Sequence, residues 1–205
     1  MQQQSLLKLE SRAVGVPGFS LRPDYVSTSE EQELLTHIDQ GPWENDWRRR
    51  IQQYGLGYAG EHGDKPSWIR DFPEWLLPLA KRVEADASFE RFPENCVINE
   101  YVPPLGIGPH KDYRAFGPTI ACVSLGSSIV IDFTHPESDR KVPIDVAVRS
   151  LWVITGEARF RWRHGIATRL ADVIEGERRF RHRRVSITFR TAKNLQLLAR
   201  AFPKL

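Results

Sequence analysis

The sequence predicts a mainly β protein of the α+β class, in which helices pack against one sheet of a β-sandwich or jelly-roll barrel. From about residue 95 onward, short runs rich in β-branched and aromatic residues recur with turns between them. Two amphipathic helical patterns precede these runs, and no regular alternation of helices with strands follows. A doubly wound parallel sheet is therefore disfavoured.

The two helical patterns lie in the first 94 residues. Ser27-Thr28-Ser29-Glu30-Glu31 is a typical helix start, with Thr28 and Glu31 at capping-box spacing, and Gly41-Pro42 ends the helix. Residues 50–58 are expected to be extended and residues 60–66 to form a surface loop. The second helix is expected over residues 75–83, after Pro73.

The predicted strands follow and account for most of the remaining chain. We expect them at residues 96–102, 119–125, 128–133, 142–148, 150–154, 159–162 and 184–190.

Size and composition are those of a soluble globular protein. The 205 residues suffice for a single domain with a sizeable core, and 40% are hydrophobic and 27% charged. No apolar run approaches the roughly 20 residues that span a bilayer, so no membrane association is expected. The N-terminal residues lack the features of a secretory signal, and only two cysteines occur. These observations favour a cytoplasmic protein, and we expect a monomer.

A histidine and an aspartate form the first candidate site. Pro109-His110-Lys111-Asp112 separates an imidazole from a carboxylate by one residue, so both face the same way in extended backbone. His164 is the best third ligand, because it borders a predicted buried strand. Two histidines and one carboxylate leave positions open for a chelating co-substrate and O2, as in non-haem Fe(II) oxygenases.

Other interpretations of these residues stay open. An H-x-D triplet is common by chance. Four other histidines compete as the third ligand: His37 on a predicted helix, His62 in a loop, His135 in a turn and His182 in a basic run. The same three ligands could hold Zn²⁺ for hydrolysis. That reaction needs a general base, and no H-E-x-x-H motif occurs.

The last predicted strand carries the second candidate site. Its alternation places Arg184, Ser186, Thr188 and Arg190 on one face and apolar side chains on the other. Paired guanidinium groups suit a dicarboxylate such as 2-oxoglutarate, although an exposed basic face would show the same pattern. Asn99 and Tyr101 share a face of an earlier strand and could bind the same carboxylate.

Taken together, these residues give the sequence a resemblance to the AlkB family of Fe(II)/2-oxoglutarate dioxygenases. The resemblance covers residues 95–190 and runs through Asn99-x-Tyr101, His110-x-Asp112, Ser124-Leu125-Gly126, Gly156-Glu157-Ala158-Arg159, His164-Gly165-Ile166 and the strand from Arg184 to Arg190. It implies a double-stranded β-helix core at residues 95–192, between an N-terminal extension (1–94) and a C-terminal tail (193–205). It also implies iron bound by His110, Asp112 and His164, and 2-oxoglutarate bound by Asn99, Tyr101, Arg184 and Arg190.

The resemblance further implies oxidative demethylation of N-alkylated bases in DNA or RNA. In the DNA-repair members an acidic residue lies two positions after the metal-binding aspartate, where this chain has Arg114. The alternatives are a hydroxylase that modifies tRNA and a protein hydroxylase or demethylase. Arginine-rich segments favour a phosphate-bearing partner, and we expect a nucleotide-recognition lid in the N-terminal extension. The candidate substrate-binding residues are Arg48, Arg50, Tyr54, Tyr58, Arg114 and Arg159.

Overall fold

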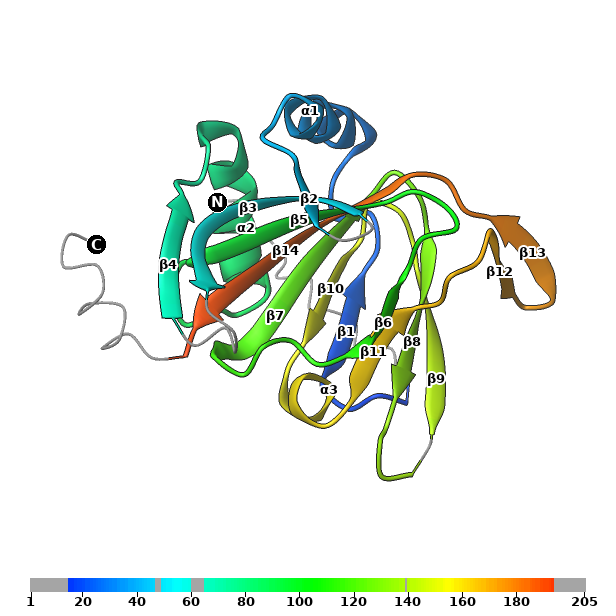
Figure 1. Cartoon of the computed structure of the whole chain (residues 1–205). Helices are drawn as coiled ribbons and strands as arrows, with labels where there is room; N and C mark the ends of the chain where they lie inside the picture. Colours follow the sequence, from blue (N-terminus) through cyan, green and yellow to red (C-terminus); the bar gives the residue numbers. More distant parts are fainter. Residues whose placement is uncertain (1–14, 47–48, 60–64, 139, 194–205) are drawn as a thin grey trace, which may run out of the picture.

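Two antiparallel sheets and a projecting hairpin make up most of the computed structural model, which describes residues 15–46, 49–59, 65–138 and 140–193 (Figure 1). The large sheet has the order β1 (Phe19–Arg22), β10 (Leu151–Ile154), β7 (Phe116–Leu125), β14 (Arg184–Ala192), β5 (Asn95–Tyr101), β3 (Arg49–Ala59) and β2 (Glu44–Asp46), and β4 (Lys65–Arg70) pairs with β3. The small sheet has the order β6 (Ile107–His110), β11 (Arg163–Ile166), β8 (Ile129–Thr134) and β9 (Lys141–Val146). The hairpin is formed by β12 (Ala171–Ile174) and β13 (Glu177–Phe180).

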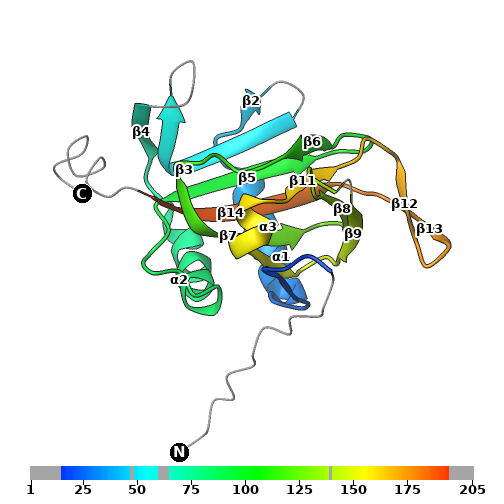
Figure 2. The same cartoon turned by 90° about the horizontal axis from the view of Figure 1, so that it is seen from below.

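The large sheet separates two hydrophobic cores. One face packs against α1 (Thr28–Asp39) and α2 (Leu77–Asp86), which follows the short 3-10 helix η1 (Glu74–Leu76) (Figure 2). The other face packs against the small sheet, where residues such as Ile120 and Trp152 meet Phe133 and Ile144. The predicted mainly β architecture with helices against one sheet is therefore confirmed.

The start of α1 differs from the sequence prediction by one residue. Ser27, not Thr28, is the N-cap, and its hydroxyl accepts a hydrogen bond from the Glu30 backbone N–H at 3.1 Å. The Glu31 carboxylate does not close a capping box but accepts from the Gly126 backbone N–H at 2.7 Å. A tertiary contact thus replaces the local one.

The predicted strand at residues 159–162 is wrong, because Gly156–Phe160 forms the short helix α3. The chain turns at Gly156, which has a φ of 48°, and the Ala158 N–H donates to the Pro17 carbonyl. Burial explains the apolar content here, since Trp162 is only 2% exposed. The sequence prediction also missed β1, β2, β4, β6, β11, β12 and β13.

The N-terminal part of the chain is not structurally separate from the rest. β1 pairs with β10, and β3 pairs with β5, so strands before residue 95 belong to the same sheet as strands after it. The boundary predicted at residue 94 stays a prediction, and most of the predicted loop and tail (residues 60–64 and 194–205) lies outside the described residues. No helix in the described ranges is both long and apolar enough to cross a bilayer.

Candidate active site

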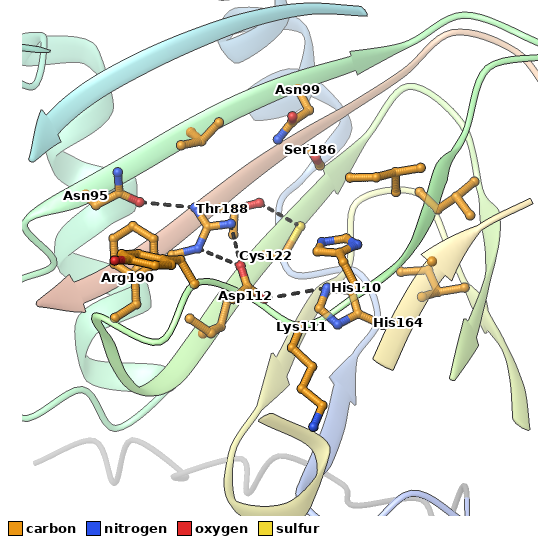
Figure 3. A pocket seen from close by; sticks show the side chains of 18 of the residues that line it. Asn95, Asn99, His110, Lys111, Asp112, Cys122, His164, Ser186, Thr188 and Arg190 are labelled. Atoms are coloured by element: carbon orange, nitrogen blue, oxygen red, sulfur yellow. Dashed lines mark hydrogen bonds and ion pairs between the residues drawn. The ribbon is translucent and has the colours of Figure 1, made fainter. Parts of the chain in front are cut away.

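A cavity of about 390 Å³ opens between the two sheets. The large sheet contributes side chains from β3, β5, β7, β10 and β14, and the small sheet contributes from β6, β8 and β11. Sequence positions more than 130 residues apart therefore line one cavity. Figure 3 shows part of this lining, from Asn95 of β5 to Arg190 of β14. All three predicted metal ligands and all four predicted 2-oxoglutarate ligands line this cavity.

The pairing of β6 with β11 brings the two histidines together. His110 is the last residue of β6, and its Cα lies opposite that of His164. The two imidazole rings are 4.5 Å apart between centroids. Asp112 follows two residues after His110, and its Oδ2 lies 3.5 Å from His164 Nε2. The structure thus gathers the H-x-D pair and the distant histidine as predicted from the sequence.

The chemistry of these three side chains fits a divalent metal ion. Within the described residues, Asp112 Oδ2 is buried without a hydrogen-bond partner, which is costly for a carboxylate unless a cation completes the site. His110 Nδ1 lies 2.9 Å from the Gly108 carbonyl oxygen, which can only accept. Nδ1 therefore carries the proton, and Nε2 keeps a lone pair for a metal, as metal-binding histidines do.

These side chains do not form a preformed cage. Among the residues that the structure describes, no three His, Cys, Asp or Glu side chains already stand at ligand distances from one common point. His164 Nε2 and Asp112 Oδ2 nevertheless lie only 3.5 Å apart, so small side-chain rotations would bring both atoms to one shared ion. The site therefore needs slight closure around a metal.

Electrostatics favour the metal-binding protonation states. Burial alone would raise the pKa of Asp112, but Arg190 and the two histidines outweigh it and hold that pKa below its ordinary value. Burial lowers the pKa of His164 to about 4, despite the nearby Asp112. At neutral pH the carboxylate is charged and this imidazole is neutral, which are the forms that bind metals.

The alternation of β14 separates core from cavity, as predicted. Val185, Ile187 and Phe189 pack against the helices, whereas Arg184, Ser186, Thr188 and Arg190 line the cavity. Figure 3 shows Ser186, Thr188 and Arg190 along one side of the site. β14 is therefore a central strand whose charged face is buried, and not an exposed basic face.

The two arginines of β14 differ in their surroundings. Arg190 Nε donates to Asp112 Oδ1 at 2.8 Å, and its Nη1 donates to Asn95 Oδ1 at 3.1 Å. Arg184 is 2% exposed, and its Nη2 donates to the Ser124 hydroxyl at 2.8 Å. Its Nε is buried without a partner in the described part of the chain, so Arg184 has capacity left for an anionic ligand.

Asn99 and Tyr101 extend the polar lining on β5. Ser186 lies opposite Asn99 and Arg184 lies opposite Tyr101, so the two strands place the four residues together. The Arg184 guanidinium lies 5.4 Å from the centre of the Tyr101 ring. Arg49 of β3 also lines the cavity, and its Nε donates to Asn99 Oδ1 at 3.0 Å.

Two predicted substrate contacts on β3 are not supported. Tyr54 is buried in the helix-side core, and its hydroxyl donates to Gln52 Oε1 at 2.8 Å. Arg50 binds Glu100 and lies 4.6 Å from the centre of the Trp43 ring. The alternation of side chains along β3 explains both corrections. Arg49 and Gln53 line the cavity, whereas the residues between and after them, Arg50, Gln52 and Tyr54, do not.

Arg159 is also not a substrate contact in this structure. It is 2% exposed, and within the described residues its guanidinium donates to backbone carbonyls alone, those of Asp112, Tyr113, Phe116 and Gly117. It therefore fixes the segment that follows the H-x-D pair. Arg114 is exposed on that segment and does not line the cavity, so its predicted role stays a prediction. Arg48 and the side chain of Tyr58 lie outside the described residues.

The sequence prediction missed several cavity residues. Asn95 shares the face of Asn99 and Tyr101, so period-2 alternation could have identified it. Arg49 depends on the pairing of β3 with β5, which no local pattern reveals. Lys111 also lines the cavity, between two of the predicted ligands.

Comparisons with known proteins agree with this geometry. Residues 38–190 match the 2OG-Fe(II) oxygenase superfamily. The chain is 35% identical over 185 residues to the uncharacterized protein L905 of Acanthamoeba polyphaga mimivirus, with 87% of each chain covered. It is 32% identical over 169 residues to the tRNA (carboxymethyluridine(34)-5-O)-methyltransferase alkbh8 of Xenopus tropicalis, covering 77% of this chain but only 26% of that protein.

A solved structure supports the same fold. The structure of OsALKBH1 superposes with a TM-score of 0.63 at 16% identity, covering 85% of this chain and 97% of that one. The enzymes of the matched family are dioxygenases that use Fe(II), 2-oxoglutarate and O2. The chain therefore belongs to the 2OG-Fe(II) oxygenase superfamily and is an AlkB-like dioxygenase.

Proposed function

We propose that this enzyme oxidises a substituent on a base in nucleic acid, with His110, Asp112 and His164 holding Fe(II). Asn99, Tyr101, Arg184 and Arg190 are the proposed 2-oxoglutarate ligands. One observation carries the proposal. The buried Asp112 Oδ2 and the buried Arg184 Nε, both without hydrogen-bond partners in the described residues, belong to side chains that line the same cavity. One atom suits a cation and the other suits an anion.

The chain's own groups bind and orient the reactants. Bound iron and 2-oxoglutarate would supply, with O2, the oxidising power that inserts an oxygen atom into a C–H bond of the substrate. Arg190 holds the Asp112 carboxylate in one orientation and keeps it ionised. Arg184 receives the far carboxylate of the co-substrate, since a guanidinium fork matches a carboxylate. The walls from both sheets exclude bulk water.

The cavity also limits how a base can enter. A base stacked inside a duplex cannot reach a site enclosed between two sheets, so the substrate is single-stranded or is flipped out. N-alkyl demethylation is the reaction we propose first, because the motif pattern from Asn99 to Arg190 resembles AlkB enzymes. The hydroxylated methyl group would leave as formaldehyde when its C–N bond breaks, and the hydroxyl proton would pass to the base nitrogen.

Hydroxylation of a tRNA base is the second candidate. The similarity to a relative named for its action on tRNA favours it, as does Arg114, where repair enzymes of the family carry an acidic residue. A protein substrate is the third candidate, and turnover with nucleic acid would exclude it.

Product analysis distinguishes these candidates. Purified enzyme with Fe(II) and 2-oxoglutarate is given N-methylated oligonucleotides, matched unmodified oligonucleotides and tRNA, and succinate, formaldehyde and base products are measured. Formaldehyde with methylated strands supports demethylation, and a stable hydroxylated nucleoside without formaldehyde supports tRNA modification. Succinate formation that no nucleic acid stimulates would exclude both and favour a protein substrate.

The proposed iron ligands are tested in the same assay. We expect His110→Ala and Asp112→Asn to abolish substrate-coupled succinate formation while the thermal unfolding curve stays cooperative. His182→Ala is the matched control, because His182 is exposed and lies outside the cavity lining. Activity retained by either ligand variant would contradict the assignment.

A further inference from the structure

The outer face of the small sheet carries a row of basic side chains that begins at the cavity. Lys111 lines the cavity and is exposed, and Figure 3 shows its side chain extending away from the two imidazole rings. Arg163 of β11 and Lys141 of β9 are also exposed. We call Lys111, Arg163 and Lys141 the basic row.

Strand register places these three residues in one line across the sheet. His110, the last residue of β6, pairs with His164 in antiparallel strands. Continuing this register by one residue past the end of β6 brings Lys111 next to Arg163. Arg163 pairs with Thr134, and Thr134 pairs with Lys141. Paired residues point to the same face, and here it is the face opposite the buried His164. The four strands lie side by side in Figure 1.

The residues of the basic row differ from most arginines of the described chain because those arginines form ion pairs with carboxylates. Arg50, Arg82, Arg149 and Arg183, among others, form ion pairs with carboxylates. In the described ranges, no ion pair joins Lys111, Arg163 or Lys141 to a carboxylate. Asp132 is an acid on the same face, two residues along β8 from Thr134. The row therefore keeps positive charge available at the surface.

Further cations flank the cavity end of the row. Arg114 and Arg161 are exposed, one on the segment after Asp112 and one at the end of α3. Hydrogen bonds from Arg159 to the carbonyls of Asp112 and Tyr113 hold these two segments together. The positive surface is thus built on a fixed framework and not on a separate loop.

We propose that the basic row binds the phosphate backbone of a single nucleic-acid strand whose target base enters the cavity. This inference rests on the proposed function and names the surface that would position its substrate. Three inter-strand steps of about 4.8 Å give the row a length of roughly 14 Å, which one small anion cannot span. A polymer with regularly repeated negative charge can contact both ends, while the cavity beside Lys111 receives a base.

Charge-reversal variants test the row. The probe is a fluorescein-labelled, unmodified 15-nucleotide RNA, and its Kd is measured by anisotropy between 50 and 300 mM salt. Each phosphate contact with a single strand contributes about 0.7 to the slope of log Kd against log salt, and therefore about fivefold in affinity near 0.1 M salt. We expect Arg163→Glu/Lys141→Glu to lower the slope by about 1.4 and to weaken binding by about 25-fold or more.

Two further variants keep the test decisive. Lys141→Gln removes one charge on an exposed edge strand, so it should fold normally and lower the slope by about 0.7. Lys81→Glu is the control for charge reversal as such, since it makes the same change as each substitution of the double variant, and Lys81 is exposed on α2 behind the large sheet. Its Kd and slope should equal those of the wild-type protein.

The outcomes separate this inference from the proposed function. Weakening confined to the row variants supports the inference. Equal loss in Lys81→Glu, or no loss in the row variants, overturns it, while nucleic-acid-stimulated succinate formation would still support the proposed function. If wild-type enzyme binds an acidic peptide but no RNA or DNA and oxidises no nucleic acid, both proposals fail together.

Discussion

Replacing Arg159 by methionine tests how the candidate metal site is supported. The guanidinium donates hydrogen bonds to the carbonyl oxygens of Asp112 at 3.0 Å and Tyr113 at 2.8 Å, and to two more carbonyls at 3.3 and 3.4 Å. Within the described residues, these hydrogen bonds all go to backbone carbonyls, so the role of Arg159 is to bind backbone. Methionine fills similar space but supplies no donor.

The expected cost follows from the two short hydrogen bonds. Each buried carbonyl left without a donor costs about 1–3 kcal/mol. Some of this loss is offset because burial disfavours the charged guanidinium and lowers its pKa. We therefore expect a net loss of about 2–4 kcal/mol in the free energy of unfolding, or roughly 4–16 °C in Tm for a domain of this size.

In Arg159→Met, the affinity of the candidate site for a metal ion should fall by more than the loss in the free energy of unfolding implies. Two of the freed carbonyls belong to Asp112 and its neighbour, so the backbone that carries the proposed ligand loses its fixed position. Outer groups that orient metal ligands are typically worth 10- to 100-fold in affinity. Titration of the folded protein with Co(II), well below Tm, measures this effect separately from stability.

Two control variants make the reasoning refutable. Arg159→Lys keeps a cation that can reach one or two carbonyls, so it should recover part of both losses. Arg161→Met changes an exposed arginine at the end of the same helix and should alter Tm and Co(II) affinity little. Unchanged Tm and Co(II) affinity in Arg159→Met would refute the supporting role of this residue.

Two other predictions concern the co-substrate and the pH dependence of stability. Arg184→Gln should raise the KM for 2-oxoglutarate about 10- to 150-fold, because a charge-assisted hydrogen bond is worth about 1.5–3 kcal/mol. Arg184→Lys should give an intermediate value, and an unchanged KM in both variants would remove Arg184 from the co-substrate site. Hydrogen bonds from Arg50 and then Arg183 lower the pKa of Glu100 below its usual 4.5. The unfolded chain therefore takes up this proton first as pH falls, so the stabilisation is complete above about pH 4.5 and is lost below it. Urea unfolding of wild type and Glu100→Gln should show a stability difference that shrinks from pH 5 to pH 3.5, and a constant difference would contradict this assignment.

Local patterns were sufficient for the features that depend on one strand. Alternation along Arg184–Arg190 indicated which side chains share a face, and the H-x-D spacing indicated two cavity residues. Both features depend only on backbone period, which is a local property. The choice of His164 as their partner also agrees with the structure, which pairs it with His110.

Features that depend on contacts between strands could not be predicted in this way. Nothing near Tyr54 in the sequence shows that its side chain packs in the helix-side core, so Tyr54 and Arg50 are predicted as substrate contacts although neither lines the cavity. Likewise, the burial of Arg159 depends on carbonyls more than 40 residues away. Several short strands, including β6 and β11, have too few residues for a clear pattern and exist through their pairing.

The central position of β14 in the sheet has a consequence for how the specificity of this enzyme can evolve. Val185, Ile187 and Phe189 pack in the core on the helix side, whereas Arg184, Ser186, Thr188 and Arg190 line the cavity. Substitutions at Ser186 or Thr188 can therefore reshape what the pocket accepts without disturbing the packing behind it. The fold allows new specificities to arise one side chain at a time on a scaffold that stays intact.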